Sequence, residues 1–466
     1  MAGVTRPYTQ TSQRLGFNLA LPTSAGWSNM YQDSGPVQSF YFDNVPSGAI
    51  DSSTGFPTSG NTSLTIQLRE GVKYNAGTYD LTWTGGGTVA GNSSPSTLVV
   101  SASQADVTLN CVGAVSNFTM TQPSPTGTYT STFTARANRG NCFRIMEAWR
   151  INEDGGTSAA SYSTSNPYVR ERSVTGGNTF YHRSLTPTMV GDLGNDFTKD
   201  LWLCFHHRAS DTNITDAIDD IIATGFSGTI YVEHSNEVWN SAFPQYSYAT
   251  SQSGTNYNGA PGEAQSVAAW HADRTIQIGT VAKAAYSGCR TVYGSQTAVP
   301  NFYNSAVNYA TEDISEIDDV AISFYFGGPP ARALSTIEGQ ALTASELAGL
   351  GQDDFDNRVV PLIEQWKAYA DVQGWPVLGY EGGPHFDHSD STTEEHYSTL
   401  AQSSDVGDVM GNVFDWWDSN LGTLAMVFQD VGDGNDPWSF YAGELGSTQP
   451  RWQAFLDSCI RPSIES

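Results

Sequence analysis

Short apolar runs rich in β-branched residues recur along this chain, separated by longer stretches with helical periodicity. Such runs are typical of strands buried on both faces of a parallel sheet, and the intervals predict the connecting helices. The expected strands cover residues 14–20, 143–147, 201–205, 229–233, 290–294, 320–326, 377–381 and 424–429. The clearest helical patterns cover residues 264–286, 354–372 and 394–421, with a short final one at 452–459. Eight strands alternating with helices predict an α/β fold, a TIM (β/α)8 barrel.

Residues 37–138 follow a different pattern, rich in Thr, Ser and Gly. Polar and apolar residues alternate with period two at 62–68, 77–83 and 98–102, and Gly, Asn and Pro mark turns between them. This alternation predicts short antiparallel strands. We therefore expect a β-sandwich-like domain at 37–138, inserted between barrel strands one and two, with the barrel formed by 1–36 and 139–466. A ligand-binding module and a purely structural scaffold both stay open as roles for it, and the structural role is slightly favoured.

The charge balance narrows the choice of partners. The 466 residues carry 48 acidic against 21 basic side chains, a formal net charge of −27, which disfavours nucleic acid and anionic membrane as partners. Hydrophobic residues make up 39% of the chain, enough to drive folding, and no apolar run is long enough to span a bilayer. The composition resembles that of extracellular enzymes, so we expect a secreted monomer whose signal peptide is absent from this sequence.

The five cysteines form no CxxC pair and no zinc-ribbon spacing. Cys142, Cys204 and Cys289 lie in or beside expected barrel strands, where a small buried thiol is the usual role. One disulfide stays open as an alternative, with Cys111 and Cys142 as the pair to test. An odd number of cysteines leaves at least one thiol unpaired.

Two of the expected strands end in glutamates. The run at 229–233 leads into His234, Ser235, Asn236 and Glu237, and the run at 377–381 ends in Glu381 before two glycines. The carboxyl ends of parallel barrel strands meet at one face, where TIM-barrel enzymes carry their catalytic groups. Cleavage of a glycosidic bond needs two carboxyl groups, about 5–5.5 Å apart when the reaction retains the anomeric configuration. Glu237 and Glu381 are therefore the candidate pair.

Other residues near these strand ends have secondary roles in this interpretation. Asn236 can hydrogen-bond a sugar 2-hydroxyl, a contact that strengthens in the transition state. Glu233 is interpreted as a supporting residue of the barrel interior, whereas Glu147 and Glu153 are lower-ranked competitors for the catalytic pair.

An Asn-Glu pair after the fourth strand and a Glu after the seventh resemble the retaining (β/α)8-barrel glycoside hydrolases of clan A. The resemblance implies that Glu237 is the acid/base and Glu381 the nucleophile in cleavage of β-glycosidic bonds of a poly- or oligosaccharide. It also implies that Arg144 and Tyr325 bind the nucleophile, with Tyr380 a weaker substitute for Tyr325. An arginine and a tyrosine hydroxyl beside the nucleophile are expected to lower its pKa.

Aromatic rings are good platforms for the flat C–H faces of sugars. The tryptophans expected in loops on the catalytic face are Trp27, Trp149, Trp239 and Trp438, with Tyr441 beside the last of them. Trp438 is expected to form the floor of the cleaved-sugar subsite. His206, after the third strand, is expected to contact sugar hydroxyls. The alternative is a polar loop residue whose hydrogen bonds are satisfied within the protein. The few basic residues favour a neutral β-linked glycan.

No cofactor or catalytic metal is expected. His385, Asp387 and His388 could suggest metal ligands, but a barrel metallohydrolase would also carry His-x-His at the first strand, which ends Gly16-Phe17-Asn18. The acidic loop with Asp430, Asp433, Asn435 and Asp436 does not match the spacing of a helix-loop-helix calcium site. Two alternatives remain open: a non-catalytic carbohydrate-binding barrel and a metal-dependent barrel hydrolase.

Overall fold

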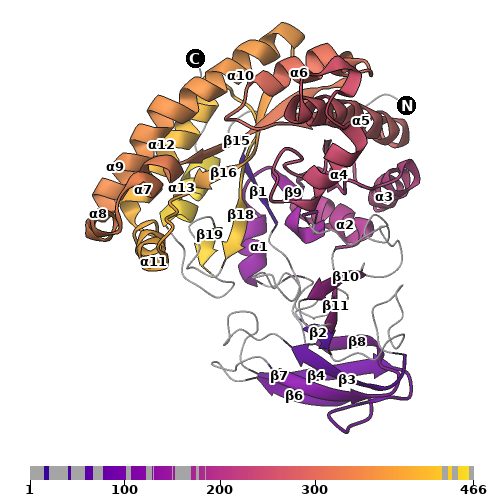
Figure 1. The fold of residues 1–466 in the computed structure, drawn as a ribbon. Coiled ribbons are helices and arrows are strands. Elements are labelled where there is room, and N and C mark those ends of the chain that lie inside the picture. The colour runs from indigo at the N-terminus through magenta and orange to yellow at the C-terminus, as the bar shows by residue number, and fades with distance from the viewer. Residues whose placement is uncertain are drawn as a thin grey trace.

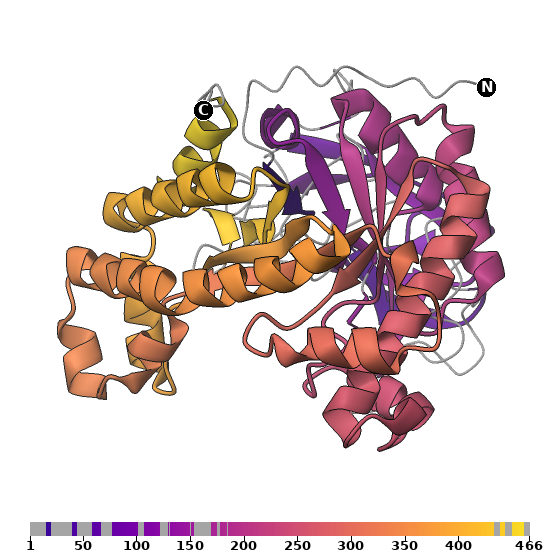
Figure 2. The same cartoon turned by 90° about the horizontal axis from the view of Figure 1, so that it is seen from above.

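A closed barrel of eight parallel strands forms the centre of the molecule (Figures 1 and 2). The computed structural model describes residues 15–19, 40–43, 58–66, 77–100, 107–121, 129, 131–149, 151–152, 169–174, 178–183, 185–432, 439–442 and 450–460. In chain order the barrel strands are β1 (Leu15–Asn18), β9 (Cys142–Ile145), β12 (Asp200–Phe205), β13 (Ile230–His234), β14 (Cys289–Gly294), β15 (Asp319–Phe326), β16 (Val377–Pro384) and β17 (Ala425–Val427). All eight coincide with strands expected from the sequence, so the predicted barrel is confirmed.

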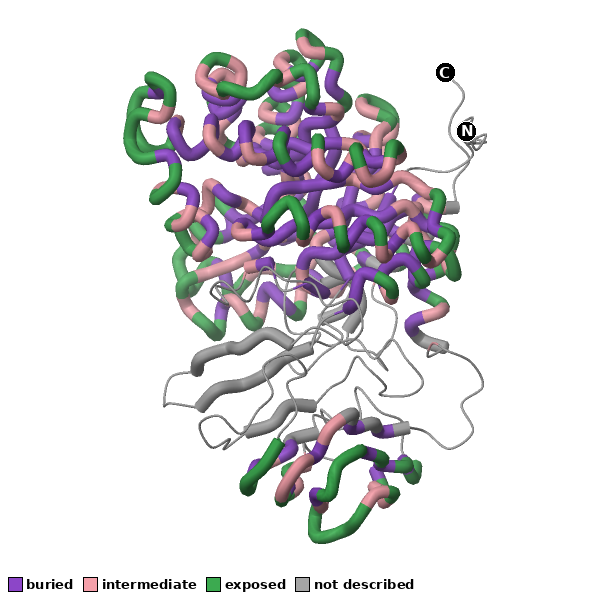
Figure 3. Tube along the Cα trace, turned by 90° about the vertical axis from the view of Figure 1, so that its right-hand side faces the viewer, coloured by how far each residue is buried: buried purple, intermediate pink, exposed green. Residues whose placement is uncertain are grey.

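Helices surround this barrel and connect its strands. They are α1 (Ser131–Ala137), α2 (Pro187–Phe197), α3 (Asp211–Ala223), α4 (Pro244–Ser253), α5 (Glu263–Ala285), α6 (Asn301–Tyr309), α7 (Gly328–Ala333), α8 (Thr336–Ala341), α9 (Ala344–Asp354), α10 (Val360–Gln373), α11 (Ser391–Leu400), α12 (Ser404–Asn420) and α13 (Pro450–Ile460). Short 3-10 turns are η2 (Glu147–Trp149), η4 (Tyr257–Gly259) and η5 (Ile314–Glu316). The barrel strands are buried along most of their length, and Figure 3 shows buried residues gathered in the interior of this part of the molecule.

Two helical predictions differ from the structure. The pattern at 394–421 is two helices, because the chain turns after α11 and Ser403 caps α12 by accepting a hydrogen bond from the backbone N–H of Val406 at 3.4 Å. The pattern at 354–372 is the end of a longer unit, in which α9 continues through the π-helical turn η6 (Phe355–Val359) into α10. A side-chain cap and a π turn are local features that hydrophobic periodicity does not reveal.

Two antiparallel sheets lie in the chain between β1 and β9. One has the order β2 (Phe40–Asp43), β3 (Asn61–Ile66), β7 (Val107–Val112) and β5 (Thr88–Val89); the other has β6 (Ser96–Val100), β4 (Gly77–Thr84) and β8 (Ser116–Thr121). Residues of both sheets share one apolar cluster, to which Leu64, Leu81, Trp83, Cys111 and Phe118 belong. Along β4 exposed and buried residues alternate, so one face of this strand is packed and the other is open. Helix α1 belongs with the barrel instead, because Phe133 and Ala137 pack in the barrel core.

The pairing of Cys111 with Cys142 is wrong. Cys111 is buried in the cluster between the two antiparallel sheets, whereas Cys142 is buried in the barrel core, and all five cysteines are free. The remaining paired strands are β10 (Val169–Val174) with β11 (Asn178–Arg183), and β18 (Gln429–Gly432) with β19 (Ser439–Ala442). Within the described part of the chain, no helix has both the length and the apolar character needed to cross a membrane.

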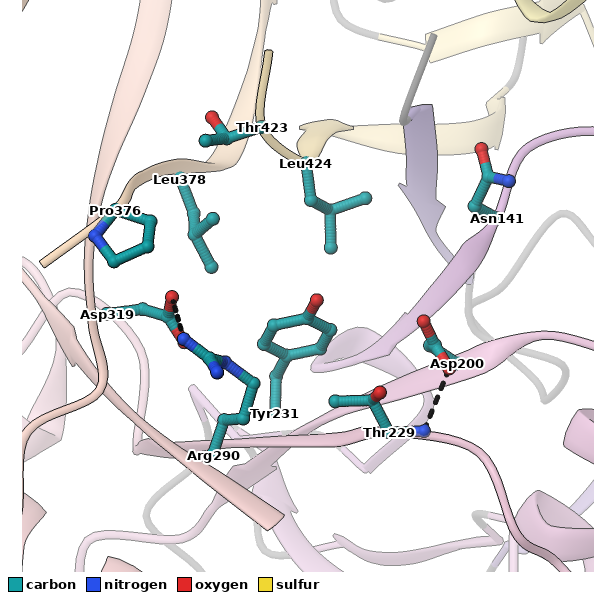
Figure 4. A pocket seen from close by; sticks show the side chains of 10 residues that line it. All are labelled: Asn141, Asp200, Thr229, Tyr231, Arg290, Asp319, Pro376, Leu378, Thr423 and Leu424. Carbon is teal, nitrogen blue, oxygen red and sulfur yellow. Dashed lines mark hydrogen bonds and ion pairs between the residues drawn. The ribbon is translucent and has the colours of Figure 1, made fainter. Parts of the chain in front are cut away.

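A cavity of about 350 Å³ opens at the amino-terminal ends of the barrel strands (Figure 4). On one side of it Arg290 forms a bidentate ion pair with Asp319, with both N–O distances 2.7 Å. At the opposite wall Asp200 accepts a hydrogen bond from the backbone N–H of Thr229 at 2.8 Å. These polar groups join neighbouring strands, as expected at the barrel end that serves stability rather than chemistry.

Candidate active site

A second cavity, of about 490 Å³, lies at the carboxyl ends of the barrel strands. Its walls come from the segments that follow β13 and β14 and from β15, β16 and η6. Glu237, Trp239, Tyr325 and Tyr380 line it, and Glu381 accepts a hydrogen bond from the hydroxyl of Tyr325. The candidate catalytic pair is therefore at the end of the barrel where TIM-barrel enzymes work.

Arg144 on β9 connects the polar groups of the barrel interior. Its side chain is fully buried and donates to Glu233 Oε2 at 2.8 Å and 3.1 Å, to Glu381 Oε2 at 3.1 Å, to Asn236 Oδ1 at 2.9 Å and to Asn18 Oδ1 at 3.1 Å. A guanidinium carries five N–H donors in a fixed plane, so one arginine can orient several acceptors at once. Arg144 therefore fixes the nucleophile candidate and the neighbour of the acid/base candidate in a single network.

Glu233 serves as the buried counter-charge of Arg144. Besides the two guanidinium bonds, its Oε2 accepts from the indole N–H of Trp202 at 2.8 Å and from the Cys204 thiol at 3.2 Å. The Arg144 guanidinium also lies 5.8 Å from the Trp202 ring centre. All of these partners are buried, so Glu233 is placed as the supporting residue expected from the sequence, away from the cavity surface.

Two tyrosines each bind one of the candidate carboxyl groups. Tyr325 donates to Glu381 Oε1 at 3.0 Å, and Tyr380 donates to Glu237 Oε1 at 3.0 Å. Burial raises the pKa of both phenols well above the ordinary value, so both stay protonated donors. The sequence-based roles thus differ in one respect: Tyr380 is no substitute for Tyr325 but binds the other glutamate.

A β-bulge explains how adjacent residues of one strand reach two different carboxyl groups. Along β15 and β16, Ile322 pairs with Gly379 and the next residue, Ser323, pairs with Glu381, so Tyr380 is the extra residue. Successive side chains of a regular strand point to opposite faces, and a bulge interrupts this alternation. Tyr380 and Glu381 can therefore both turn into the site.

Glu237 follows β13 in a backbone conformation that is unusual for a residue with a side chain. Ser235 and Glu237 have φ angles of 61° and 43°, in the left-handed region. The Glu237 side chain is partly exposed, and its Oε2 accepts from the amide of Asn240 at 2.8 Å. Together with the Tyr380 contact, this bond gives each carboxyl oxygen of Glu237 one donor.

Asn236 is held from several sides. Its amide nitrogen donates to Asn152 Oδ1 at 3.1 Å, while its side-chain oxygen accepts from Arg144. Gln245 on α4 is fully buried and donates to the same Asn152 oxygen at 2.7 Å and to the backbone carbonyl of Asn236 at 2.6 Å. The orientation of the Asn236 amide is therefore fixed before any substrate binds.

The electrostatic environment raises the pKa of Glu381 to about 8. Burial is the largest cause and the negative charge of Glu237 the second, whereas Arg144 and Tyr325 act in the opposite direction. Arg144 and Tyr325 each lower this pKa, as expected from the sequence, but desolvation and the like charge of Glu237 outweigh them. At neutral pH the two carboxyl groups together retain one proton.

The remaining sequence-predicted residues are placed as follows. Trp239 lines the cavity, with its ring edge-to-face against Tyr380 at 6.0 Å. Trp149 is fully buried and donates from its indole N–H to the Leu185 carbonyl at 3.0 Å, so its ring packs in the core and presents no face to a sugar. His206 is also fully buried and accepts from the backbone N–H of Arg208 at 3.2 Å, which favours the alternative of a satisfied polar residue.

Trp27, Glu153 and Trp438 lie outside the described residues, as do Asp433, Asn435 and Asp436, and for Asp430 and Tyr441 only the backbone is described. Of the groups considered as metal ligands, Asp387 forms an ion pair with Arg332 at 2.5 Å and His388 contacts the Leu334 carbonyl at 3.1 Å. Among the described residues there is no group of three His, Cys, Asp or Glu side chains that could hold a metal ion.

Sequence reasoning missed several members of this network: Asn18, Asn152, Trp202, Asn240 and Gln245. Asn18 at the end of the first strand and Asn240 three residues after Glu237 stood in positions that could have been noticed. Gln245 carried no signal, because a glutamine in the first turn of a helix is ordinarily solvated.

Comparisons with known proteins add only a likeness of fold. No family model and no curated protein matches this chain. An α-L-arabinofuranosidase of family 51 from Bifidobacterium longum is 12% identical, with a TM-score of 0.47 over 71% of this chain and 66% of that one. An α-L-arabinofuranosidase from Thermotoga maritima, in complex with arabinose, is 10% identical, with a TM-score of 0.44 over 70% of this chain and 62% of that one. A xylanase from Cellvibrio japonicus is 12% identical, with a TM-score of 0.34 over 91% of this chain and 99% of that one.

The matched region thus spans less than two-thirds of the length of either arabinofuranosidase. At such low identities a likeness concerns the fold alone. The chemistry of this site is therefore argued from its own side chains.

Proposed function

We propose that this protein is a retaining glycoside hydrolase that cleaves β-glycosidic bonds of a poly- or oligosaccharide through a covalent glycosyl-enzyme. The arrangement of Glu381 carries the proposal: a buried carboxyl group that receives one donor from Arg144 and one from Tyr325, whose side chain lines the same cavity as Glu237. Hydrogen bonds from charged and phenolic donors stabilise a carboxylate and fix its position, as a nucleophile requires.

In the first step the Glu381 carboxylate attacks the anomeric carbon and the bond to the leaving oxygen breaks. The proton held by the carboxyl pair is transferred from Glu237 to that oxygen, so the leaving group departs as an alcohol. In the second step Glu237, now ionised, takes a proton from water while the water oxygen attacks the anomeric carbon. The ester bond to Glu381 breaks, its carboxylate returns and the sugar is released with its original configuration.

The position of the shared proton follows from the donors around the two carboxyl groups. Arg144 is a permanent positive charge in contact with Glu381, whereas the two donors to Glu237, Tyr380 and Asn240, are neutral. The negative charge of the pair is therefore better placed on Glu381 and the proton on Glu237 when substrate is bound.

A neutral β-linked glycan is the proposed substrate class. Two arginines line the cavity, but each is neutralised by an aspartate, Arg332 by Asp387 at 2.5 Å and Arg358 by Asp354 at 2.6 Å. The partly exposed Trp239 ring supplies an amphipathic surface for a sugar face. Secretion and a monomeric state remain part of the proposal.

A reducing-sugar assay on a panel of neutral and acidic polysaccharides tests this function. The variants are Glu237→Gln, Glu381→Gln and the double variant, each with its melting temperature measured as a folding control. Release of sugar from one polymer by the wild type, with loss of about 10³-fold or more in the double variant, is the expected result. Binding without turnover on the whole panel would instead identify a carbohydrate-binding barrel. Turnover that survives the double variant, or that disappears with chelator, would contradict the carboxylate mechanism.

A further inference from the structure

The segment that carries Glu237 is strained, and strain of this kind must be held by its surroundings. The left-handed conformations of Ser235 and Glu237 are unfavourable for residues with a Cβ atom. Such conformations persist only where neighbouring contacts over-determine them. The groups that hold this segment are therefore groups on which the position of the proposed acid/base depends.

One of these contacts is a hydrogen bond between two buried histidines, His234 at the end of β13 and His271 on helix α5. His234 is the last residue of β13, directly before Ser235, and its Nδ1 lies 2.9 Å from Nδ1 of His271 on α5. His271 also places its Nε2 3.0 Å from the carbonyl oxygen of Gly294, the last residue of β14. The exposed fractions of His234 and His271 are 1% and 2%, so water does not compete for these bonds.

The partners determine which nitrogen carries each proton. A carbonyl oxygen only accepts, so His271 must carry its proton on Nε2. Burial lowers the pKa of His271 to about 4 and that of His234 well below its ordinary value, so both rings are neutral near pH 7. His271 Nδ1 is then a lone-pair acceptor, and His234 donates to it from Nδ1–H. The charges of Arg274 and His207 lower the pKa of His234 further, whereas a hydrogen bond with the His207 backbone acts in the opposite direction and is outweighed.

The same helix also contacts the chain on the other side of Glu237. Val238 is fully buried and packs in one apolar cluster with Val267 of α5. The ring of Trp239 lies edge-to-face against His271 at 6.2 Å and against Tyr380 at 6.0 Å. His271 therefore contacts both His234, which ends β13, and Trp239, two residues after Glu237.

From these contacts we infer that His234 and His271 are positioning residues, whose Nδ1–Nδ1 hydrogen bond fixes the Ser235–Glu237 backbone so that Glu237 can protonate the leaving oxygen. The inference rests on the proposed acid/base role of Glu237. Neither histidine lines the cavity at the carboxyl ends of the strands, so the effect is transmitted through the backbone and through Trp239.

Two variants, His234→Asn and His271→Gln, each keep one hydrogen-bonding group of the histidine they replace, and with His234→Leu they separate a positioning role from general packing. The side-chain amide of Asn occupies the place of the imidazole Nδ1, so His234→Asn retains a donor toward His271, whereas His234→Leu does not. The amide of Gln reaches the place of Nε2, so His271→Gln retains a donor toward Gly294 but removes the acceptor for His234. Leu and Gln are close to His in volume and Asn is smaller, and melting temperatures show which variants are folded.

The assay compares 2,4-dinitrophenyl and phenyl β-glycosides of the sugar that the polysaccharide panel identifies. The dinitrophenolate leaves without a proton, whereas the phenolate needs the acid. Misplacement by about 1 Å costs on the order of 10²-fold in rate. His234→Leu and His271→Gln should therefore lose about 10²-fold in kcat on the phenyl glycoside and less than about threefold on the dinitrophenyl glycoside. His234→Asn should stay within about threefold of wild type on both.

Glu237→Gln is the reference in the same assay. If Glu237→Gln does not distinguish the two leaving groups, the acid/base assignment fails and the histidine inference fails with it. If Glu237→Gln distinguishes them but both His234→Leu and His271→Gln slow the two substrates equally, or slow neither, the assignment of Glu237 stands and the histidine inference is overturned. Should His234→Leu not fold, the comparison of His271→Gln with His234→Asn gives the same decision.

Discussion

Arg144 Nη1 and Glu381 Oε2 lie 3.1 Å apart, although their strands, β9 and β16, are separated in the barrel by β1 and β17. The contact therefore crosses the barrel interior, and the opposite edge of the same guanidinium holds Glu233. One buried positive charge is thus shared by two buried carboxyl groups. A site of this kind has consequences for stability as well as for catalysis.

Replacement of Arg144 should destabilise the barrel strongly. Arg144→Met leaves Glu233 and Glu381 buried without their counter-charge, and removing one partner of a buried ion pair costs roughly 3–5 kcal/mol. Urea denaturation should show that loss in the free energy of unfolding. The double variant Arg144→Met/Glu233→Gln, which removes one of the stranded charges, should recover part of it. If Arg144→Met were as stable as the wild type, Arg144 would not be needed to balance the buried charges of Glu233 and Glu381.

The two tyrosines should have separable effects because each binds a different carboxyl group. A hydrogen bond to a charged group contributes about 1.5–3 kcal/mol, or roughly a 10–100-fold change in rate if it is lost in the transition state. Tyr325→Phe should lower kcat/KM for aryl glycosides with good and poor leaving groups alike, since it weakens the nucleophile. Tyr380→Phe should lower it mainly for poor leaving groups. Identical patterns for the two variants would contradict the assignment of one tyrosine to each carboxyl group.

The pH dependence should reflect the proton shared by the pair. The pKa of Glu381 is raised to about 8, so the pair holds a proton below that pH and loses it above. The acid step needs this proton, and kcat/KM should therefore fall as the pH rises through about 8.

Glu237→Gln removes the negative charge that raises this pKa, so Glu381 should ionise at a lower pH than in the wild type. The pH midpoint for labelling of Glu381 by a 2-deoxy-2-fluoro glycoside with an activated leaving group measures this shift. An unchanged midpoint would show that the two carboxyl groups do not interact.

All five cysteines should titrate as thiols in denaturant without reductant. In the native protein four of them are buried and Cys459 is partly buried, so reaction with a thiol reagent should be slow before unfolding. The melting temperature should not change with dithiothreitol, because no covalent link is broken. A count below five in the absence of reductant would contradict the free state of the cysteines.

The sequence predicted the barrel because buried parallel strands are apolar along their whole length, and eight such runs were separated by helical intervals. It also placed Glu237 directly after the fourth strand and Glu381 in the second half of the seventh, towards the catalytic end of the barrel, and their catalytic roles stay a prediction. The contact of Tyr380 with Glu237 could not be predicted, because it depends on a β-bulge that interrupts the regular alternation of side chains.

The sequence also did not reveal which of the residues that follow barrel strands are buried. Trp149 and His206 follow barrel strands and were expected at the sugar, but each turns back into the protein, where a main-chain group satisfies its polar atom. The direction of such a side chain is set by the neighbouring elements and not by its place after a strand. For the same reason Gln245, which no pattern distinguished, is a central member of the network around Asn236.

Chemical rescue of Glu381→Ala tests the central assignment most directly. The variant should lose turnover, and added azide or formate should restore it on an activated aryl β-glycoside, because the small anion enters the space of the missing carboxylate. Nuclear magnetic resonance of the product should show a glycosyl azide of inverted, α configuration, since only one displacement has occurred. The inverted product from Glu237→Ala instead of Glu381→Ala would show that the two roles are reversed, and no rescue of either folded variant would contradict the double-displacement account.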